Sequence, residues 1–428
     1  KKKFKGKIEK YMKFLIYQII IHALIILAPI KFAFRGLKQP DYFKFLFERF
    51  GIYQLKRIKH KKIIWFHCVS VGETKAIDSL LKKIVPLYKD YDFLITHSTP
   101  TGRDVKLMDS NRIHRAYLCM DSWFFNQCFL NYFSPKTAIF LETEIWPGML
   151  HALNKRNIPA LLINARLSDK SLGKYLRFKS FSKEVLNRFN LIIAQSEEDQ
   201  QNFNQLTNKK VLVYKNLKFN QLVPAISKLE KSHLLTQLGL NNKKIISLIS
   251  SRHGEEDLFL DAMKNFLKNK DYALIIVPRH PQRFQEVKNI IQKKGYSFNA
   301  MSSRLKRKPS VPLVIGDTMG EVYKYIGLSD LVFIGGSFKD YGSHSPIESI
   351  LLKKPVVVGP STFNFKSIIN SGLKGKVFLQ IKPDQISETI KKFFEKKYNT
   401  EFKENINVFL KENQKDEDKL IKLISKYF

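Results

Sequence analysis

The sequence predicts an α/β protein built on two parallel sheets. Apolar runs rich in β-branched residues alternate with segments whose apolar residues recur at helical spacing, first over residues 63–217 and again over residues 244–358. A chain of 428 residues also suits two globular domains better than one. Polar residues cluster where the apolar runs stop. That is the edge at which ligands bind in sheets of this kind.

The first strand and helix come from residues 62–76 (KIIWFHCVSVGETKA). We expect a strand over residues 63–71, a break at Gly72 and a helix after it. Glu73 then falls in the first helical turn. A carboxylate there complements the helix dipole, and a carboxylate at a strand end can also take a proton from an attacking hydroxyl. The pattern leaves both interpretations open.

The N-terminal segment is apolar. Residues 14–30 (FLIYQIIIHALIILAPI) carry no charged residue and are flanked by basic residues on both sides. This length is at the short end of what spans a bilayer, and no small-residue cleavage site precedes Lys31. We expect a membrane anchor, spanning or embedded, with the rest of the chain cytoplasmic. A buried core helix is the alternative. The aromatic-rich residues 39–51 either lie on the membrane surface or fold against the first domain.

The formal net charge of +36, from 74 basic and 38 acidic residues, predicts an anionic partner. The basic residues are dispersed along the chain, which argues against a nucleic-acid-binding protein. The three cysteines form no CxxC motif, so neither a disulfide framework nor a zinc site is indicated, and a reducing compartment is expected.

In the first half, further strands are expected at residues 93–97, 115–119, 137–141, 191–195 and 211–214, with another after Ile158. Glu142 and Glu144 directly follow the strand at 137–141. Paired carboxylates at a strand end indicate a binding site. Arg166 follows the strand after Ile158 and can pair with a carboxylate or phosphate.

In the second half, residues 216–232 are expected to form an interdomain linker. Five strands follow, at residues 244–250, 273–277, 311–315, 331–334 and 355–358, and each ends in Gly, Ser, Thr, His or Arg. Gly-rich turns that run into helices suit phosphate binding through backbone amides. The turns match neither GxGxxG nor the P-loop, which argues against a dehydrogenase or an NTPase. His344 and Glu348 stand four residues apart, but no further metal ligands accompany them.

Seven strings connect the chain to a known family. WFHCVSVGETKA, ETEIWP, NARLSDKS, NLKFN, VPRHPQRF, GDTMGE and GGSF…GSHSPIE occur in this order. In this order and at these topological positions they resemble the bacterial 3-deoxy-D-manno-octulosonate (Kdo) transferases of lipopolysaccharide synthesis. The resemblance runs from the apolar N-terminus to about Asn364. The chain departs from the family pattern in two places. Residues 250–257 (SSRHGEED) differ from the family string, which leaves open which of residues 251–253 faces the donor. In GSHSPIE, Ser345 stands where an Asn is expected.

The resemblance implies a GT-B fold, in which two Rossmann-like domains face a central cleft. It implies a membrane anchor at residues 1–36, an acceptor domain at 37–217, a nucleotide-sugar domain at 218–395 and a helical tail at 396–428 that packs back toward the first domain. The implied enzyme is an inverting glycosyltransferase at the cytoplasmic face of the inner membrane. It would move Kdo from CMP-Kdo to a lipid A precursor, with no metal or other cofactor and no nucleic-acid partner.

The resemblance also implies roles for individual residues. Glu73 would be the general base, and Glu142, Glu144 and Arg166 would bind the acceptor. The donor would be bound by residues at the strand ends of the second domain, namely Ser251, Arg279, His280, Met319, Gly320, Glu321, Gly336, Ser337, Glu348 and Asn364. One alternative is a GT-B glycosyltransferase that uses another nucleotide sugar. Another alternative is a membrane-attached scaffold whose active site has decayed. The presence of Glu73, Glu142 and Glu144 argues against it.

Overall fold

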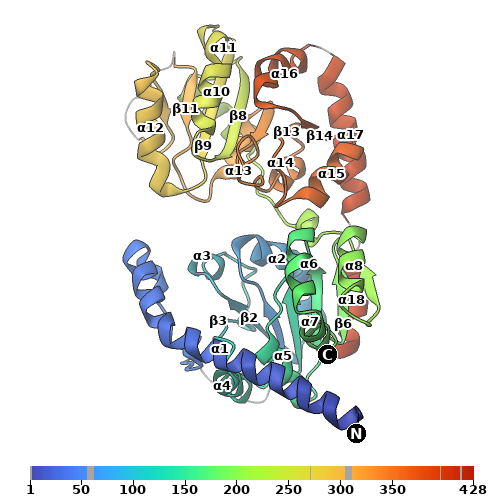
Figure 1. Cartoon of the computed structure of the whole chain (residues 1–428). Coiled ribbons are helices and arrows are strands. Elements are labelled where there is room, and N and C mark those ends of the chain that lie inside the picture. Colours follow the sequence, from blue (N-terminus) through green and yellow to red (C-terminus); the bar gives the residue numbers. More distant parts are fainter. Residues whose placement is uncertain (1, 55–61, 270, 304–310, 396, 415–416) are drawn as a thin grey trace. The chain divides into compact units, whose positions relative to one another are not determined.

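The chain folds into two compact units. The computed structural model describes residues 2–54, 62–269, 271–303, 311–395, 397–414 and 417–428 (Figure 1). Unit 1 consists of Lys1–Leu222 with Gln414–Phe428, and unit 2 of Val223–Asn413. The boundary expected at residue 396 falls on a position outside the described residues.

Unit 1 is built on a seven-stranded sheet in the order β3-β2-β1-β4-β5-β6-β7. All neighbouring strands are parallel. The first strand therefore lies inside the sheet, and the chain order changes direction beside it, where open α/β sheets bind their ligands. The strands are β1 Lys62–His67, β2 Tyr91–His97, β3 Ile113–Tyr117, β4 Thr137–Leu141, β5 Ala160–Ala165, β6 Leu191–Ala194 and β7 Val211–Val213.

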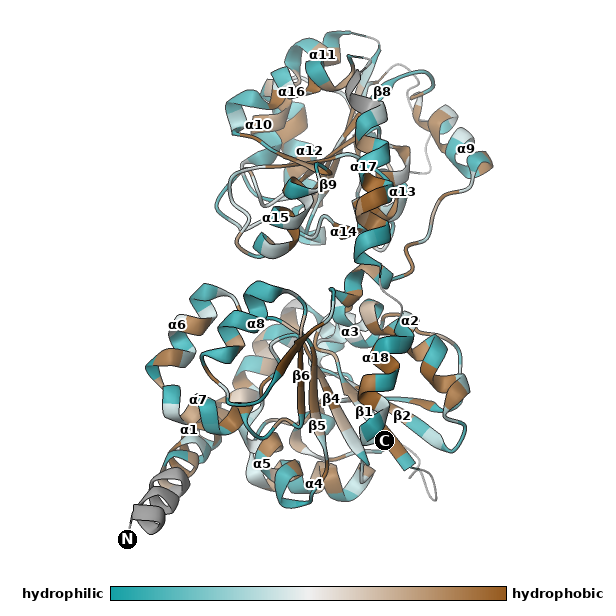
Figure 2. Cartoon of the chain, turned by 90° about the vertical axis from the view of Figure 1, so that its right-hand side faces the viewer, coloured by the Kyte–Doolittle hydropathy of each residue, from teal (hydrophilic) through white to brown (hydrophobic). Residues whose placement is uncertain are grey.

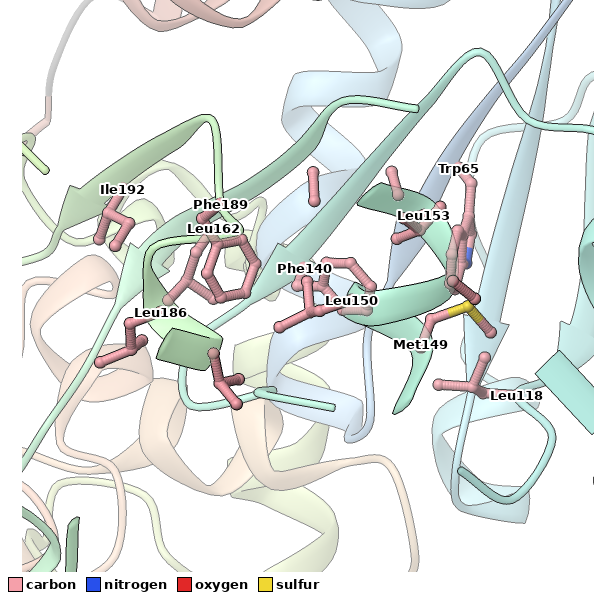
Figure 3. Close-up of a cluster of buried hydrophobic side chains, with 14 of the residues drawn as sticks. Trp65, Leu118, Phe140, Met149, Leu150, Leu153, Leu162, Leu186, Phe189 and Ile192 are labelled. Carbon is pink, nitrogen blue, oxygen red and sulfur yellow. The ribbon is translucent and has the colours of Figure 1, made fainter. Parts of the chain in front are cut away.

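Helices cover this sheet and enclose its apolar core. The strands are predominantly hydrophobic (Figure 2). On one side of the sheet, Trp65, Phe140 and Leu162 meet Leu150 and side chains of the neighbouring helices (Figure 3). The helices are α2 Val71–Leu87, α3 Pro100–Arg103, α4 Trp123–Phe133, α5 Pro147–Lys155, α6 Asp169–Arg177, α7 Lys179–Leu186, α8 Glu197–Asn204 and α18 Glu417–Ile424.

The predicted break at Gly72 was wrong. Strand β1 ends at His67 and helix α2 begins at Val71, so Gly72 lies in the first helical turn. The cause is Ser70, whose hydroxyl accepts a hydrogen bond from the Glu73 amide at 3.4 Å. A Ser at the N-cap that accepts from an amide of the first turn starts a helix, and the prediction overlooked it.

Helix α1 (Lys2–Lys38) is docked on unit 1 along one face. Tyr17 donates a hydrogen bond to the buried Asp121, and Gln18 is hydrogen-bonded to the backbone of Asp121 and Trp123. Phe14 stacks on His151 of α5 at 4.2 Å. Figure 1 shows the helix running past α4 and α5. Residues 12–37 are long and apolar enough to cross a membrane, and their large exposed side chains are Met12, Leu15, Ile16, Ile19, Ile20, Leu24, Ile26, Leu27, Ile30, Phe34 and Leu37.

Unit 2 holds a second parallel sheet of seven strands in the order β10-β11-β9-β8-β12-β13-β14. Five strands were predicted, while the short edge strands β10 and β14 were not. The strands are β8 Lys244–Ser251, β9 Tyr272–Pro278, β10 Asn299–Ala300, β11 Leu313–Ile315, β12 Leu331–Ile334, β13 Val356–Val358 and β14 Phe378–Gln380.

The helices of unit 2 begin inside the expected linker. Residues Leu217–Asn220 form a 3-10 turn that still belongs to unit 1, and α9 begins at Lys228, so the last residues of the predicted linker are helical. The remaining helices are α10 Glu255–Ala262, α11 Lys264–Lys268, α12 Phe284–Lys293, α13 Val322–Leu328, α14 Ile347–Leu351, α15 Lys366–Lys374, α16 Ile386–Phe393 and α17 Lys397–Asn413, with α9 ending at Leu238. The predicted fold class, an α/β chain with two parallel sheets, is confirmed.

The C-terminal residues return to unit 1. Helix α18 packs against α2, where Leu420, Ile421 and Ile424 join the apolar core beneath that helix. The buried Glu417 accepts a hydrogen bond from Ser79 of α2. The last helix thus supports the helix that carries Glu73.

Candidate active site

Glu73 is held at the amino end of α2 and is 6% exposed. One carboxylate oxygen accepts a hydrogen bond from the Val69 amide at 2.7 Å, and the other accepts one from the Ser70 hydroxyl at 2.8 Å. Burial, together with the negative charge of Glu142, nevertheless raises the pKa of Glu73 to about 8. The carboxylate therefore caps the helix and is also basic enough to take a proton near neutral pH.

Glu142 follows β4 in a left-handed backbone conformation, with φ of 56°. Non-glycine residues rarely adopt this conformation, and such strain collects at functional sites. The Glu142 carboxylate forms an ion pair with Lys218, whose ammonium also lies close to Gly72. Lys218 thus neutralises part of the Glu142 charge close to the first turn of α2.

Glu144, the second carboxylate after β4, is fixed from two sides. It accepts a hydrogen bond from Trp146 Nε1 at 2.9 Å, and His67 Nε2 lies 3.5 Å from the same oxygen. His67 is fully buried, and its Nδ1 is 2.8 Å from Thr96 Oγ1. The negative charge of Glu144 also contributes to the raised pKa of Glu73. The predicted base, Glu73, is therefore electrostatically coupled to both predicted acceptor-binding carboxylates, Glu142 and Glu144.

Arg166 comes from the loop after β5. Its backbone amide donates to the Glu142 carbonyl at 3.3 Å, and its carbonyl accepts from the Thr143 hydroxyl at 2.7 Å. Its side chain is half-buried, and its positive charge acts on the buried Asp199 carboxylate. The backbone of Arg166 is thus bound to the turn that carries both glutamates, and its role in binding an acceptor stays a prediction.

Unit 2 gathers positive and imidazole groups where β8, β9 and β12 end. The guanidinium of Arg252 lies against His280, and the Arg279 amide donates to the Ser251 carbonyl at 3.1 Å. Burial and the charge of Arg279, followed by that of Arg252, lower the pKa of His344 to about 3. Burial and the charge of Arg252 also lower the pKa of His280. The arginine charges that contribute to these shifts after burial would suit an anion such as a phosphate.

A buried carboxylate organises the glycine turn of this cluster. Glu255 is fully buried and accepts hydrogen bonds from the amides of Arg252 (2.8 Å), Gly336 (2.7 Å) and Phe338 (2.9 Å). Gly336 has φ of +72°, and a Cβ there would lie 3.1 Å from the His344 ring. The glycine therefore allows both the turn and the close approach of the histidine.

Two predicted donor ligands have their hydroxyls engaged within unit 2. Ser251 is fully buried and donates to Glu256 at 2.6 Å. Ser337 is also fully buried, donates to the Ile334 carbonyl at 2.5 Å and accepts from the Gly359 amide at 2.7 Å. In this structure both side chains hold turns together, and their contact with a donor stays a prediction.

The other predicted donor residues lie on neighbouring turns of unit 2. Met319 is exposed and precedes Gly320, which has positive φ. Glu321 is paired with Lys324 at 2.8 Å, which lowers the pKa of Glu321. Glu348 lies part-buried in the first turn of α14, and the exposed Asn364 donates to the Tyr341 carbonyl at 2.8 Å. Their roles stay predictions.

Sequence reasoning missed several residues of these clusters. Lys218 lies in the string NLKFN, His67 in WFHCVSVGETKA and Glu255 in SSRHGEED, but none of them is predicted as a site residue. His344 stands out in the sequence only through its spacing to Glu348. Pairing between distant strand ends brings them to the site, so no local pattern could have found them. Among the described residues, no group of three or more His, Cys, Asp or Glu side chains is arranged to hold a metal ion.

Comparison with known proteins identifies the family. The family model described as 3-Deoxy-D-manno-octulosonic-acid transferase (kdotransferase) matches residues 44–221. The 3-deoxy-D-manno-octulosonic acid transferase of Haemophilus influenzae is 33% identical over 81% of this chain and 82% of its own length. That of Rickettsia felis is 32% identical over 86% of this chain and 80% of its own length.

The fold agrees with solved structures. A glycosyltransferase from Rickettsia africae superposes with a TM-score of 0.57 at 13% identity, covering 86% of this chain and 98% of that protein. At this identity the likeness concerns the fold alone. The sequence relatives cover both units, including the strand ends that carry Glu73 and His344. The chain therefore belongs to the 3-deoxy-D-manno-octulosonic acid transferase family of glycosyltransferases, as its motifs predicted.

Proposed function

We propose that this chain transfers Kdo from CMP-Kdo to a lipid A precursor with inversion at the sugar carbon, and that Glu73 is the general base. The observation that carries the proposal is the Glu73 carboxylate, which is buried at a strand end beside Glu142 and has its pKa raised to about 8. The acceptor hydroxyl oxygen forms the new bond to the sugar carbon. The bond from that carbon to the CMP phosphate breaks with its electron pair on the phosphate, and the hydroxyl proton passes to Glu73.

The donor would bind to unit 2. Family membership supports Kdo as the transferred sugar. The leaving phosphate needs positive groups, and Arg252 and Arg279 can supply them. The remaining donor residues named from the sequence would contact the nucleotide or the sugar. In unit 1, Arg166 would pair with an anionic group of the acceptor.

Helix α1 would attach the enzyme to the cytoplasmic face of the inner membrane. One face of the helix is bonded to unit 1 through Tyr17, Gln18 and Phe14, while apolar side chains cover its exposed face. A helix docked in this way suits a position along the membrane surface, with the exposed face in the lipid.

The test is a transfer assay in detergent with purified protein, a tetraacylated lipid A precursor and CMP-Kdo, read out by product mass. A gain of one or more Kdo units, undiminished by excess EDTA, is the expected result. Transfer from a UDP-sugar with none from CMP-Kdo would instead favour a glycosyltransferase with another donor. If EDTA abolishes the activity and a divalent metal restores it, only the expected metal independence is refuted, and the proposed reaction stands.

A further inference from the structure

The turn of residues 68–70, which joins β1 to α2 just before Glu73, has all three of its carbonyls held by side chains. His97 Nδ1 lies 3.1 Å from the first carbonyl oxygen. The Thr99 hydroxyl donates to the second at 2.9 Å, and the Thr74 hydroxyl donates to the third at 2.9 Å. His97 ends β2 and Thr99 follows in the next turn. The proposed mechanism gives neither residue a role.

One peptide unit joins His97 to Glu73. The Cys68 carbonyl and the Val69 amide belong to the same planar group, so fixing one end of it fixes the direction of the other. His97 faces the carbonyl at 3.1 Å, and the amide donates to Glu73 Oε2 at 2.7 Å. A hydrogen bond to the carbonyl also polarises the peptide and strengthens donation by its amide. His97 can therefore act on the Glu73 carboxylate through this peptide.

His97 is fully buried and neutral, and its surroundings decide which nitrogen carries the proton. Burial and the charge of Arg115 lower the pKa of His97 to about 3. A carbonyl oxygen can only accept, so the proton lies on Nδ1 and is donated to Cys68. Nε2 is buried and has no hydrogen-bond partner among the described residues. A proton on Nε2 would therefore be a buried donor without an acceptor, which is costly.

Gly102 of α3 packs against the same turn. A Cβ at Gly102 would lie 2.9 Å from the Thr99 hydroxyl oxygen and 3.0 Å from the Val69 carbonyl oxygen. The Thr99 hydroxyl also accepts from the Gly102 amide at 3.2 Å and so caps α3. The segment of residues 97–102 thus lies directly on the turn, and this packing limits how far its peptides can rotate.

The charges around Glu73 do not depend on His97. Ionisable side chains around Glu73 include those of Cys68, Glu142, Glu144 and Lys218. Burial and the two glutamates raise the pKa of Glu73, whereas the amide hydrogen bond from the turn lowers it. Because His97 is neutral, another neutral residue in its place changes none of these charges. Such a substitution changes only the support of the peptide.

We propose that His97 is a positioning residue for the general base. Its Nδ1–H fixes the peptide between Cys68 and Val69, and the amide of that peptide holds one oxygen of Glu73 in place. Proton transfer needs a defined orientation of the carboxylate toward the acceptor hydroxyl, so loss of this support costs rate. The role of His97 rests on the proposed role of Glu73, which Glu73→Gln tests separately. If Glu73→Gln loses transfer while His97→Leu keeps it, only the role of His97 is refuted.

The experiment measures kcat and KM for Kdo transfer across pH with the purified full chain in detergent. His97→Leu removes the donor, while His97→Asn keeps an N–H donor near the position of Nδ1. In His97→Leu, kcat near neutral pH should fall about tenfold, the size that one hydrogen bond to a charged group supports. The rise of kcat/KM should move to higher pH, because a weaker amide hydrogen bond leaves the pKa of Glu73 higher. His97→Asn should restore both, and CMP binding should be unchanged in either variant.

His114→Leu is the matched control. His114 lies on β3 of the same sheet, with Nε2 2.9 Å from a carboxylate oxygen of Asp92. This change also removes an imidazole hydrogen bond, so it should lower the thermal stability and leave the position of the pH profile unchanged. An unaltered kcat and pH profile in His97→Leu would overturn the role of His97, and so would a loss that His97→Asn does not restore.

The tautomer of His97 gives a second test that does not require His97→Leu to fold. Isotope labelling of the histidine nitrogens lets NMR of the unaltered chain report which ring nitrogen carries the proton. The His97 signals are assigned by their absence from the spectrum of His97→Asn. They should show a neutral ring with its proton on Nδ1 near neutral pH. A proton on Nε2, or on both nitrogens, would contradict the proposed role.

Discussion

The two units share one architecture and carry opposite chemistry. In unit 1 the strand ends bring together three carboxylates, Glu73, Glu142 and Glu144, and the pKa of Glu73 is raised. In unit 2 the corresponding strand ends bring together Arg252, Arg279 and two histidines, and the pKa values of both histidines are lowered. Burial and neighbouring negative charges thus raise the pKa of Glu73 in one unit, whereas burial and neighbouring positive charges lower the pKa values of the two histidines in the other.

This difference indicates that the sheet determines where the site residues lie, whereas the residue types in the turns determine the chemistry of the site. In each unit, a buried carboxylate at the site also accepts hydrogen bonds from backbone amides. Glu73 accepts from the backbone of Val69 and Glu255 from that of Gly336. Glu255 accepts three amide hydrogen bonds, whereas Glu73 accepts one amide and one hydroxyl. The carboxylate with fewer backbone amide donors is the one proposed to exchange a proton.

The largest effect is expected for Glu73→Gln. This change keeps the shape of the side chain and removes the base, so the transfer rate should fall by about two or more orders of magnitude. CMP binding, which is assigned to unit 2, should persist. Glu197→Gln is the control, because Glu197 is an exposed carboxylate in the first turn of α8. A Glu73→Gln enzyme with nearly full turnover would refute the assigned base.

Arg279→Met tests the positive cluster of unit 2. Loss of this charge should weaken CMP binding about tenfold, as expected for one charge-assisted hydrogen bond. It should leave the pH dependence set by Glu73 unchanged. Isothermal titration with CMP measures the effect, and Lys391→Met removes the same charge from an exposed site on α16 of unit 2. Equal affinities for the two variants would remove Arg279 from the donor site.

Gly336→Ala should destabilise unit 2 by about 1–2 kcal/mol for the left-handed backbone alone, and further through contact with His344. Gly295→Ala separates these costs, because Gly295 has φ of +79° and open space around its Cα. Denaturant unfolding compares the two variants. If Gly336→Ala proves no more costly than Gly295→Ala, the packing of His344 against the turn is not tight.

A further expected effect is the dependence of stability on pH. The folded chain holds the Glu73 proton more tightly than the unfolded chain, whose glutamate pKa is near 4.5. The stabilisation from the protonated carboxyl is therefore fully present below about 4.5 and is lost as pH rises through about 8. Glu73→Gln should flatten this part of the stability profile of unit 1, measured by denaturant unfolding between pH 5 and about 9. A profile equal to that of the unaltered chain would contradict the raised pKa.

Much of the fold could be predicted because central strands of a parallel sheet are continuous apolar runs. Strands β10 and β14, which were not predicted, lie at the sheet edges, and β10 has only two residues, too few for a periodic signal. The strand-end positions of Glu73, Glu142 and Glu144 could be predicted from the sequence, while their roles stay predictions. The ion pair of Glu142 with Lys218 and the packing of His344 on Gly336 depend on long-range pairing, which no local pattern contains.

The central claim is that neighbouring carboxylates tune Glu73 as a base. The most direct test is the pH dependence of kcat/KM for the unaltered enzyme and for Glu142→Gln. Because the Glu73 carboxyl must lose its proton to act, kcat/KM should rise with pH and level off above about 8. Removing the Glu142 charge lowers the pKa of Glu73, so the rise in Glu142→Gln should move to lower pH. A rise at the same pH in both enzymes would contradict this account, and so would a rise near the ordinary glutamate pKa in the unaltered enzyme.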